Sequence, residues 1–302
     1  MRESLIERIN RLRRERNAVI LAHNYQLPEI QDIADEVGDS LELARKAARS
    51  EADVIVFCGV RFMAETAALL APDKTVLLPE PTAGCPMADM ARAEDVRRLK
   101  ESHPGAAVVC YVNTSVEVKA ECDLCCTSAN AVKIVETIEP EREVIFLPDK
   151  NLGHYVQTRL NRPLILWQGF CPSHVRILLQ DVQRARHDFP GALIMVHPES
   201  PSEVVEAADM ALGTGGMCRV AREAEQDTIV VGTEIGMLHR LRKENPDKRF
   251  VPLAEQAVCR NMKKTTLESV DRALSDMTEQ VTIPKEIAAR ALASVQRMVE
   301  VG

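Results

Sequence analysis

Three cysteines recur at nearly equal intervals along this chain, and this internal repeat constrains the fold more than any other feature. Cys85, Cys171 and Cys259 are separated by 171 − 85 = 86 and 259 − 171 = 88 positions. Offsets of 88 and then 86 relate three further sets of polar residues: His23, Tyr111 and His197; Tyr25, Asn113 and Glu199; and Ser40, Ser128 and Thr214. A repeat whose polar and thiol positions stay in phase predicts three copies of one structural unit around a shared site.

Each copy contains short apolar runs that alternate with segments of helical periodicity. The runs of the first copy cover 18–23, 53–59 and 75–80, and those of the other copies cover 106–112, 143–148, 163–169, 192–197, 228–234 and 249–255. Continuous β-branched runs are typical of parallel strands that helices cover on both faces. The alternation predicts an α/β protein with three similar three-layer α/β domains, whose parallel sheets lie around a pseudo-threefold axis.

The phase of the repeat also predicts the domain boundaries. We expect a first domain from residues 1–88 plus 260–302, a second from 89–172 and a third from 173–259. Pro284 and the helical pattern after it predict a closing helix, with proline near its first turn. We place this helix on the first domain because chain termini usually lie close together.

Composition and charge exclude several classes of function. The formal charge of −7 weakly disfavours a nucleic-acid surface. The basic runs at 11–16 and 97–100 alternate with apolar residues at helical spacing, which favours solvated helix faces. No apolar stretch approaches the length of a membrane span, and the mixed charges of the first residues predict no signal peptide. Nine cysteines in such a chain indicate a reducing compartment, so we expect a cytoplasmic protein whose cysteines are metal ligands, catalytic thiols or core residues.

Polar residues follow the first strand of each copy, at the edge of a parallel sheet where ligands bind. His23, Tyr111 and His197 lie at these strand ends. The hydroxyl residues of the repeat each precede a helical run, so we expect them to cap helix N-termini, which attract anions. Three such ends around one axis predict a chamber for a small, multiply anionic substrate.

The three repeating cysteines converge on the same axis and suit either zinc or an iron–sulfur cluster. Structural zinc sites usually take four ligands. A 4Fe–4S cluster held by three cysteines leaves one iron open as a Lewis acid. The motif Cys122-x-x-Cys125-Cys126 has no counterpart in the other copies, so we interpret it as core packing, together with Cys58, Cys110 and Cys218.

Several segments, in order along essentially the whole chain, resemble the quinolinate synthase family. They are LAHNYQLPEIQDIADEVGDS at 21–40, CPMADM at 85–90, YVNTS at 111–115, CTSANAV at 126–132, HPE at 197–199, GTEIGM at 232–237 and CRNMKKTTLE at 259–268. The resemblance implies one 4Fe–4S cluster and the condensation of iminoaspartate (iminosuccinate) with dihydroxyacetone phosphate. The products are quinolinate, phosphate and water, in a step of de novo NAD biosynthesis.

The resemblance also assigns roles to individual residues. The cysteines of the repeat match the cluster ligands, and Tyr25 falls at the active-site tyrosine. The family's substrate-binding positions match His23, Ser40, Tyr111, Asn113, Ser128, His197, Glu199 and Thr214. We expect Tyr25 and Glu199 to transfer protons, assisted by His23 and His197. Ser200 and Gly213 depart from the family pattern, in which Cys and Ser are common at these positions.

Two alternatives stay open at this point. An iron–sulfur hydro-lyase acting on another hydroxy-acid would use the same open iron, and a non-catalytic iron–sulfur sensor would need the cysteines alone. The expected partners are the small anionic substrates, with possible transient contact to the oxidase that produces iminoaspartate. We expect a monomer or homodimer that binds neither nucleic acid nor membrane.

Overall fold

Three sheets, each of four parallel strands, arise from the three copies of the repeat. The computed structural model describes residues 3–301. The first unit holds β1 (Ala18–His23), β2 (Glu36–Gly38), β3 (Val54–Cys58) and β4 (Thr75–Leu77). The second holds β5 (Ala107–Tyr111), β6 (Leu124–Cys126), β7 (Val144–Leu147) and β8 (Ile165–Leu166). The third holds β9 (Leu193–Val196), β10 (Met210–Ala211), β11 (Thr228–Gly232) and β12 (Arg249–Pro252).

The strand order is the same in every sheet, β2-β1-β3-β4, β6-β5-β7-β8 and β10-β9-β11-β12. All pairs are parallel, as the apolar runs predicted. The edge strands β2, β6 and β10 were not predicted, because two or three residues with a single neighbouring strand leave no recognisable apolar run. The predicted α/β class with three similar units is confirmed.

Helices separate the strands and cover the sheets. They are α1 (Leu5–Glu15), α2 (Pro28–Ile33), α3 (Ser40–Arg49), α4 (Arg61–Leu70), α5 (Ala93–Ser102), α6 (Val116–Lys119), α7 (Ala131–Glu136), α8 (Lys150–Leu160), α9 (Leu179–Asp188), α10 (Ser202–Ala207), α11 (Thr214–Glu223), α12 (Met237–Glu244), α13 (Leu267–Asp276) and α14 (Lys285–Glu300). Every residue of the central strands β3, β5, β7 and β9 is buried. Burial on both faces explains why these strands read as continuous apolar runs.

The C-terminal helix α14 bridges two units instead of belonging to the first alone. It packs on α3 and α4 of the first unit and on β6 and α6 of the second. Ser294 donates to the Lys119 carbonyl at 3.0 Å, and Asn130 donates to the Met298 carbonyl at 2.9 Å. Helix α13, by contrast, packs on α1 of the first unit. The closing segment therefore joins the first and second units.

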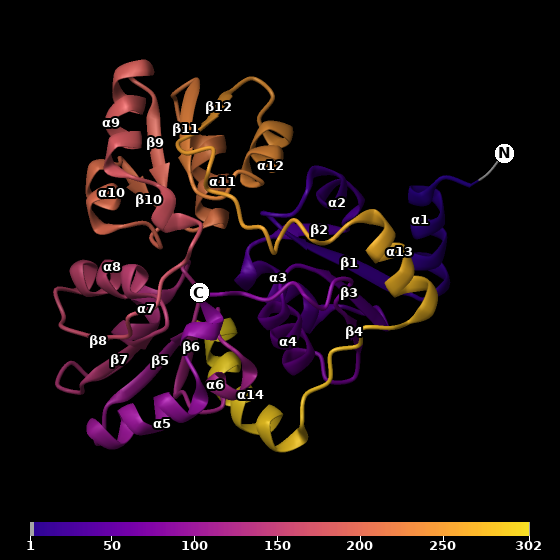
Figure 1. Cartoon of the computed structure of the whole chain (residues 1–302), viewed down its shortest axis with the longest axis horizontal. Helices are drawn as coiled ribbons and strands as arrows, with labels where there is room; N and C mark the ends of the chain where they lie inside the picture. Colours follow the sequence, from indigo (N-terminus) through magenta and orange to yellow (C-terminus); the bar gives the residue numbers. More distant parts are fainter. Residues whose placement is uncertain (1–2, 302) are drawn as a thin grey trace.

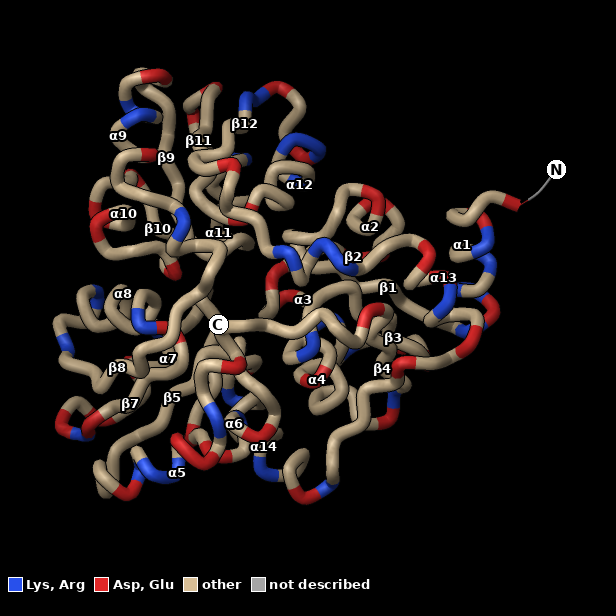
Figure 2. Tube along the Cα trace, viewed as in Figure 1, with Lys and Arg blue, Asp and Glu red and all other residues tan. Residues whose placement is uncertain are grey.

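The three units are arranged around a common centre, where the carboxyl ends of their strands meet (Figure 1). In each sheet the first strand of the unit (β1, β5 or β9) pairs with a strand on both sides. The chain forms the edge strand on one side next, and then crosses over to form the strand on the other side. Such a switch of direction opens a crevice beyond the carboxyl end of the strand. Charged residues lie mostly along the outer helices and loops (Figure 2). Among the described residues, no helix has the length and apolar character needed to cross a membrane.

Candidate functional site

One cavity of about 70 Å³ lies where the strands β1, β5 and β9 end. Its wall includes residues at or just after the ends of these strands, which are His23, Tyr25, Tyr111, Asn113, His197 and Glu199. It also includes the remaining residues of the repeat, which are Ser40, Ser128, Thr214, Cys85, Cys171 and Cys259. The structure therefore brings together every residue that the repeat selected. Their individual roles stay predictions.

Backbone N–H groups two or three residues further along the chain act on each of the three cysteines of the cavity. Those of Met87 and Ala88 favour the thiolate form of Cys85. That of His174 favours the thiolate of Cys171, and those of Asn261 and Met262 favour the thiolate of Cys259. Backbone N–H groups aimed at sulfur stabilise the negative charge of a metal-bound thiolate.

Without a positive charge beside them, these thiols stay protonated. Burial raises the pKa of Cys85 to about 12, and it raises the pKa values of Cys171 and Cys259 in the same direction. A bound metal supplies the charge that deprotonates a coordinating thiol. Three partly exposed thiols facing one cavity, each with an N–H donor on its sulfur, thus fit a group that binds through thiolates.

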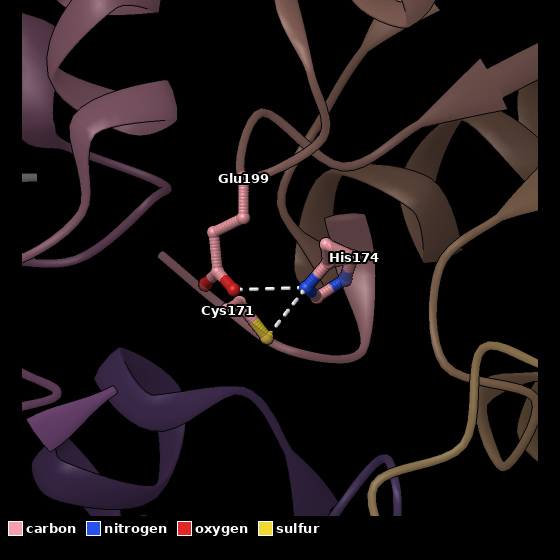
Figure 3. Close-up of side chains that lie close together, drawn as sticks. All are labelled: Cys171, His174 and Glu199. Carbon is pink, nitrogen blue, oxygen red and sulfur yellow. Dashed lines mark hydrogen bonds and ion pairs between the residues drawn. The ribbon is translucent and has the colours of Figure 1, made fainter. Parts of the chain in front are cut away.

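His174 is the main residue that sequence reasoning missed. Its Nδ1 lies 3.1 Å from the Cys171 sulfur and 2.8 Å from Glu199 Oε2, as Figure 3 shows. The three donor atoms lie within 4.8 Å of one another and could hold a metal ion. The corresponding positions in the other copies are Ala88 and Met262, so the repeat gave no signal for His174. The spacing Cys171-x-x-His174 was the only local sign.

A chain of hydrogen bonds connects Tyr25 to His174 through Thr233. The Tyr25 hydroxyl lies 2.7 Å from Thr233 Oγ1, which lies 2.8 Å from His174 Nε2. Because Nδ1 of His174 faces the Glu199 carboxylate, we place its proton there, which leaves Nε2 to accept from Thr233. Thr233 in turn can accept from the Tyr25 hydroxyl. The geometry provides a path for a proton between Tyr25 and the imidazole ring.

Burial and neighbouring charge set the protonation states in the cavity. Burial and the charge of Glu199 raise the pKa of Tyr25 well above its ordinary value. Burial lowers the pKa values of His23 and His197 to about 3, so both rings are neutral near pH 7. Burial opposes ionisation of Glu199, but the close contact with His174 and the hydrogen bond from Tyr111 hold its pKa below the usual range. The cavity thus combines a protonated phenol, neutral imidazoles and a carboxylate.

The predicted helix caps are only partly correct. Ser40 and Thr214 are the first residues of α3 and α11, while the capping positions belong to Asp39 and Gly213. Ser128 lies three positions before the start of α7, whose capping position is Asn130. Ser128 therefore contributes its hydroxyl to the cavity wall but does not lie at a helix N-terminus.

Asp39 is a second carboxylate that the sequence did not reveal. It accepts hydrogen bonds from the N–H groups of Leu41 and Glu42 in its own helix and from Gly215 at the start of α11. A Cβ at Gly213 would lie 2.9 Å from the Ser128 hydroxyl. Glycine at position 213 therefore permits the close approach of α11 to Ser128, which explains how this departure from the family pattern is accommodated.

Fold and site together define the class of this protein. It is an α/β protein of three units with a chamber at the carboxyl ends of its strands, lined by thiols, imidazoles and carboxylates. Concave sites of this kind, with buried ionisable groups of shifted pKa, are typical of enzymes.

Comparison with known proteins identifies the family. Residues 7–300 match the family described as quinolinate synthetase A protein. A quinolinate synthase of Dehalococcoides mccartyi (strain CBDB1) is 56% identical over 300 residues, which cover 99% of both chains. Those of Methanoregula boonei and Methanosarcina barkeri are 55% identical over 294 residues and 51% identical over 297 residues, covering 97% or more of each chain. The chain belongs to the quinolinate synthetase A protein family, as its sequence motifs indicated.

Proposed function

We propose that the protein is a quinolinate synthase, a transferase of de novo NAD biosynthesis. It condenses iminoaspartate with dihydroxyacetone phosphate and forms quinolinate, phosphate and water. The observation that carries this proposal is the convergence of all in-phase residues of the repeat in one cavity. The names of relatives that align over nearly the whole chain support the same reaction.

The proposed cofactor is one 4Fe–4S cluster held by Cys85, Cys171 and Cys259. Bound by these three thiolates, the cluster would keep one iron open and would supply a Lewis acid for a leaving hydroxyl. The N–H donors on all three sulfurs support the assignment. We assign His174 and Glu199 to orientation and proton transfer beside the cluster rather than to its ligand set.

Anionic substrates must bind here without a lysine or arginine in the wall. Among the described residues, the cavity is lined by no Lys or Arg, and it contains the carboxyl groups of Asp39 and Glu199. We assign recognition of the substrate carboxylates and phosphate to neutral donors, which are the Ser40, Ser128 and Thr214 hydroxyls, the Asn113 amide and the imidazoles. Neutral His23 and His197 can each donate one ring N–H.

Dehydration and imine formation require a group that gives and takes protons near pH 7. Tyr25 retains its proton because of its raised pKa, and it is connected through Thr233 to His174. Glu199 stabilises positive charge on the His174 ring through the 2.8 Å contact to Nδ1. We therefore assign Tyr25 as the group that exchanges protons with substrate, and Glu199 as the carboxylate that supports this exchange.

The test is anaerobic assay of the purified holoprotein. Iminoaspartate and dihydroxyacetone phosphate are supplied, and quinolinate is measured by mass. Formation of quinolinate that disappears in Cys171→Ala is the expected result. A protein that contains iron and sulfide but releases no quinolinate would favour a hydro-lyase acting on another hydroxy-acid. A protein without iron would remove the cluster from the mechanism.

The role of Glu199 can be tested with Glu199→Gln. This substitution preserves the shape of the side chain and removes its charge, so the variant should bind substrate and turn over about 10²–10⁴-fold more slowly. Turnover near that of the unmodified enzyme would exclude Glu199 from proton transfer.

A further inference from the structure

The loop that carries Cys259 contacts both other cysteine loops. Asn261 donates a hydrogen bond from its side-chain amide to the Gly84 carbonyl at 2.8 Å, next to Cys85. Ser173, two residues after Cys171, donates from its hydroxyl to the Val258 carbonyl at 3.2 Å. The loop 258–263 is therefore placed to set the spacing of all three thiols.

A buried ion pair fixes this loop to the third unit. Glu234 follows β11 and is fully buried, with an exposure of 0%. Its carboxylate accepts from the backbone N–H of Cys259 at 3.1 Å and from that of Gly236 at 2.7 Å. Lys263 Nζ lies 2.9 Å from Glu234 Oε1 and balances the charge.

The same lysine reaches the first unit at the residue that carries the predicted catalytic phenol. Lys263 Nζ donates to the backbone carbonyl of Tyr25 at 2.5 Å. A Cβ at Gly236 would lie 2.6 Å from Lys263 Nζ and 2.8 Å from the Tyr25 carbonyl oxygen. Only glycine at position 236 leaves room for this contact, so the ion pair occupies a space built for it.

We propose that the Glu234–Lys263 ion pair is a positioning device that sets the register between Cys259 and Tyr25. Neither residue is among the described residues that line the cavity, so neither is assigned contact with substrate. The inference deepens the proposed function at the same site and rests on it for the catalytic consequences, whereas the positioning itself does not depend on it. The Glu234 carboxylate accepts a hydrogen bond from the Cys259 amide, and Lys263 donates one to the Tyr25 carbonyl. Because the two side chains are paired, a displacement of Cys259 is transmitted to Tyr25, and the reverse.

The physical reason for a strong effect is the burial of Glu234. Removing one member of a buried pair leaves an uncompensated charge, and the structure relaxes to hydrate it. In Lys263→Met the aliphatic stem is retained, but the charge and both hydrogen bonds are lost. Glu234 would then move toward water and release the Cys259 amide. Lys263→Arg retains the charge and should recover part of the effect.

The first readout is hydrogen exchange in cluster-free protein, which needs neither cofactor nor substrate. In Lys263→Met, amides in the segment 257–263 should exchange about tenfold faster than in the unmodified protein. Glu234→Gln provides a second variant, because it removes the carboxylate charge and leaves Lys263 uncompensated while retaining the side-chain shape, and it should show the same acceleration. The matched control is Lys243→Met, since Lys243 Nζ lies 2.6 Å from Asp32 and also joins the third unit to the first, but on the surface.

The second readout is the anaerobic holoprotein. In Lys263→Met a chelator should remove iron about tenfold faster, and kcat should fall with little change in KM, because the substrate-binding hydroxyls are untouched. Lys243→Met should match the unmodified protein, and Lys263→Arg should be intermediate. A purely structural role would instead reduce thermal stability in Lys263→Met without accelerating exchange selectively at 257–263.

The outcomes separate this inference from the proposed function. Unchanged exchange at 257–263 in both Lys263→Met and Glu234→Gln would overturn the positioning role, as would an equal change in Lys243→Met. If exchange accelerates as expected while the unmodified protein forms no quinolinate, the positioning role stands and the proposed reaction falls.

Discussion

The chamber and the sheet cores both contain cysteines, but the surroundings of these side chains differ. Cys85, Cys171 and Cys259 are partly exposed and line the cavity, and nearby backbone N–H groups favour their thiolate forms. The other cysteines are buried outside the cavity wall, among them Cys125 and Cys126 within strand β6. Burial raises the pKa values of Cys125 and Cys126, as it does those of the chamber cysteines, so the direction of the pKa shift does not separate the two groups. The number of cysteines alone therefore does not indicate a metal site. The position of each cysteine in its unit decides whether its thiol faces the chamber or packs in the core.

Histidines divide in the same way. His23, His174 and His197 line the cavity and are buried, whereas His187 is exposed, with 89% of its side chain accessible. The rings of His174 and His197 stack with centroids 4.6 Å apart, and that of His23 contacts Tyr25 edge-on. Burial and mutual contact, rather than residue type, give the chamber its unusual protonation states.

The largest expected effect distinguishes the two groups of cysteines. Cys171→Ala removes a proposed ligand and should abolish bound iron and sulfide, measured by chemical analysis and visible absorption. Cys125→Ala is the matched control, because its thiol is buried beside Cys110 on the neighbouring strand and outside the cavity. Full cluster content in Cys171→Ala, or loss of the cluster in Cys125→Ala, would break the comparison.

The second effect concerns the tyrosines. Tyr25→Phe preserves the ring but interrupts the path to His174, so turnover should fall about 10²–10⁴-fold with the cluster retained. Tyr155→Phe is the control, since this hydroxyl lies outside the chamber with the Ala211 carbonyl 3.5 Å away. Steady-state assay of both variants under anaerobic conditions gives the answer. Comparable activity in the two variants would contradict a special role for Tyr25.

The third effect is a pH dependence of stability. Burial, reinforced by the nearby charge of Lys263 and opposed by that of Glu199, lowers the pKa of His23 from 6.5 to about 3. Between these values the unfolded chain binds more protons than the folded one, so the free energy of unfolding should decrease as pH falls below about 6.5. The slope is up to about 1.4 kcal/mol per pH unit for each such histidine.

Denaturant titrations of the cluster-free protein between about pH 5 and 6.5 measure this slope, above the range in which carboxyl groups dominate. His23→Asn should reduce the slope, and His187→Asn on the surface should leave it unchanged. An equal slope in all three proteins would show that His23 is not buried as a neutral ring.

The features that the sequence predicts correctly are those that recur in all three units. The strands other than β2, β6 and β10 and the phase of the three cysteines were predictable because each copy must bury the same apolar runs and present the same face to the centre. His174, Thr233 and Glu234 were not, because each has a role in one unit only and no partner in phase. Their positions depend on contacts between units, which local patterns do not encode.

The closing helix illustrates the same limit on a larger scale. Its boundaries followed from Pro284 and the helical periodicity, whereas its contacts with both the first and second units did not. An apolar helix face indicates that something covers it, but sequence does not say which unit does so. Asp39 and Gly213 were not predicted for the same reason. Asp39 matters for the contact of α11 with α3, and Gly213 for the contact of α11 with Ser128.

The smallest expected effect tests the core half of the comparison. Cys125 is fully buried on β6, in register with Cys110 on β5, so Cys125→Ala removes packed atoms from the second sheet and should lower the free energy of unfolding by about 1 kcal/mol. Denaturant titration of the cluster-free protein measures this change, and turnover per bound cluster in the holoprotein should stay the same. A change in turnover per cluster without a change in stability would mean that Cys125 communicates with the chamber, and the division between chamber thiols and core thiols would have to be redrawn.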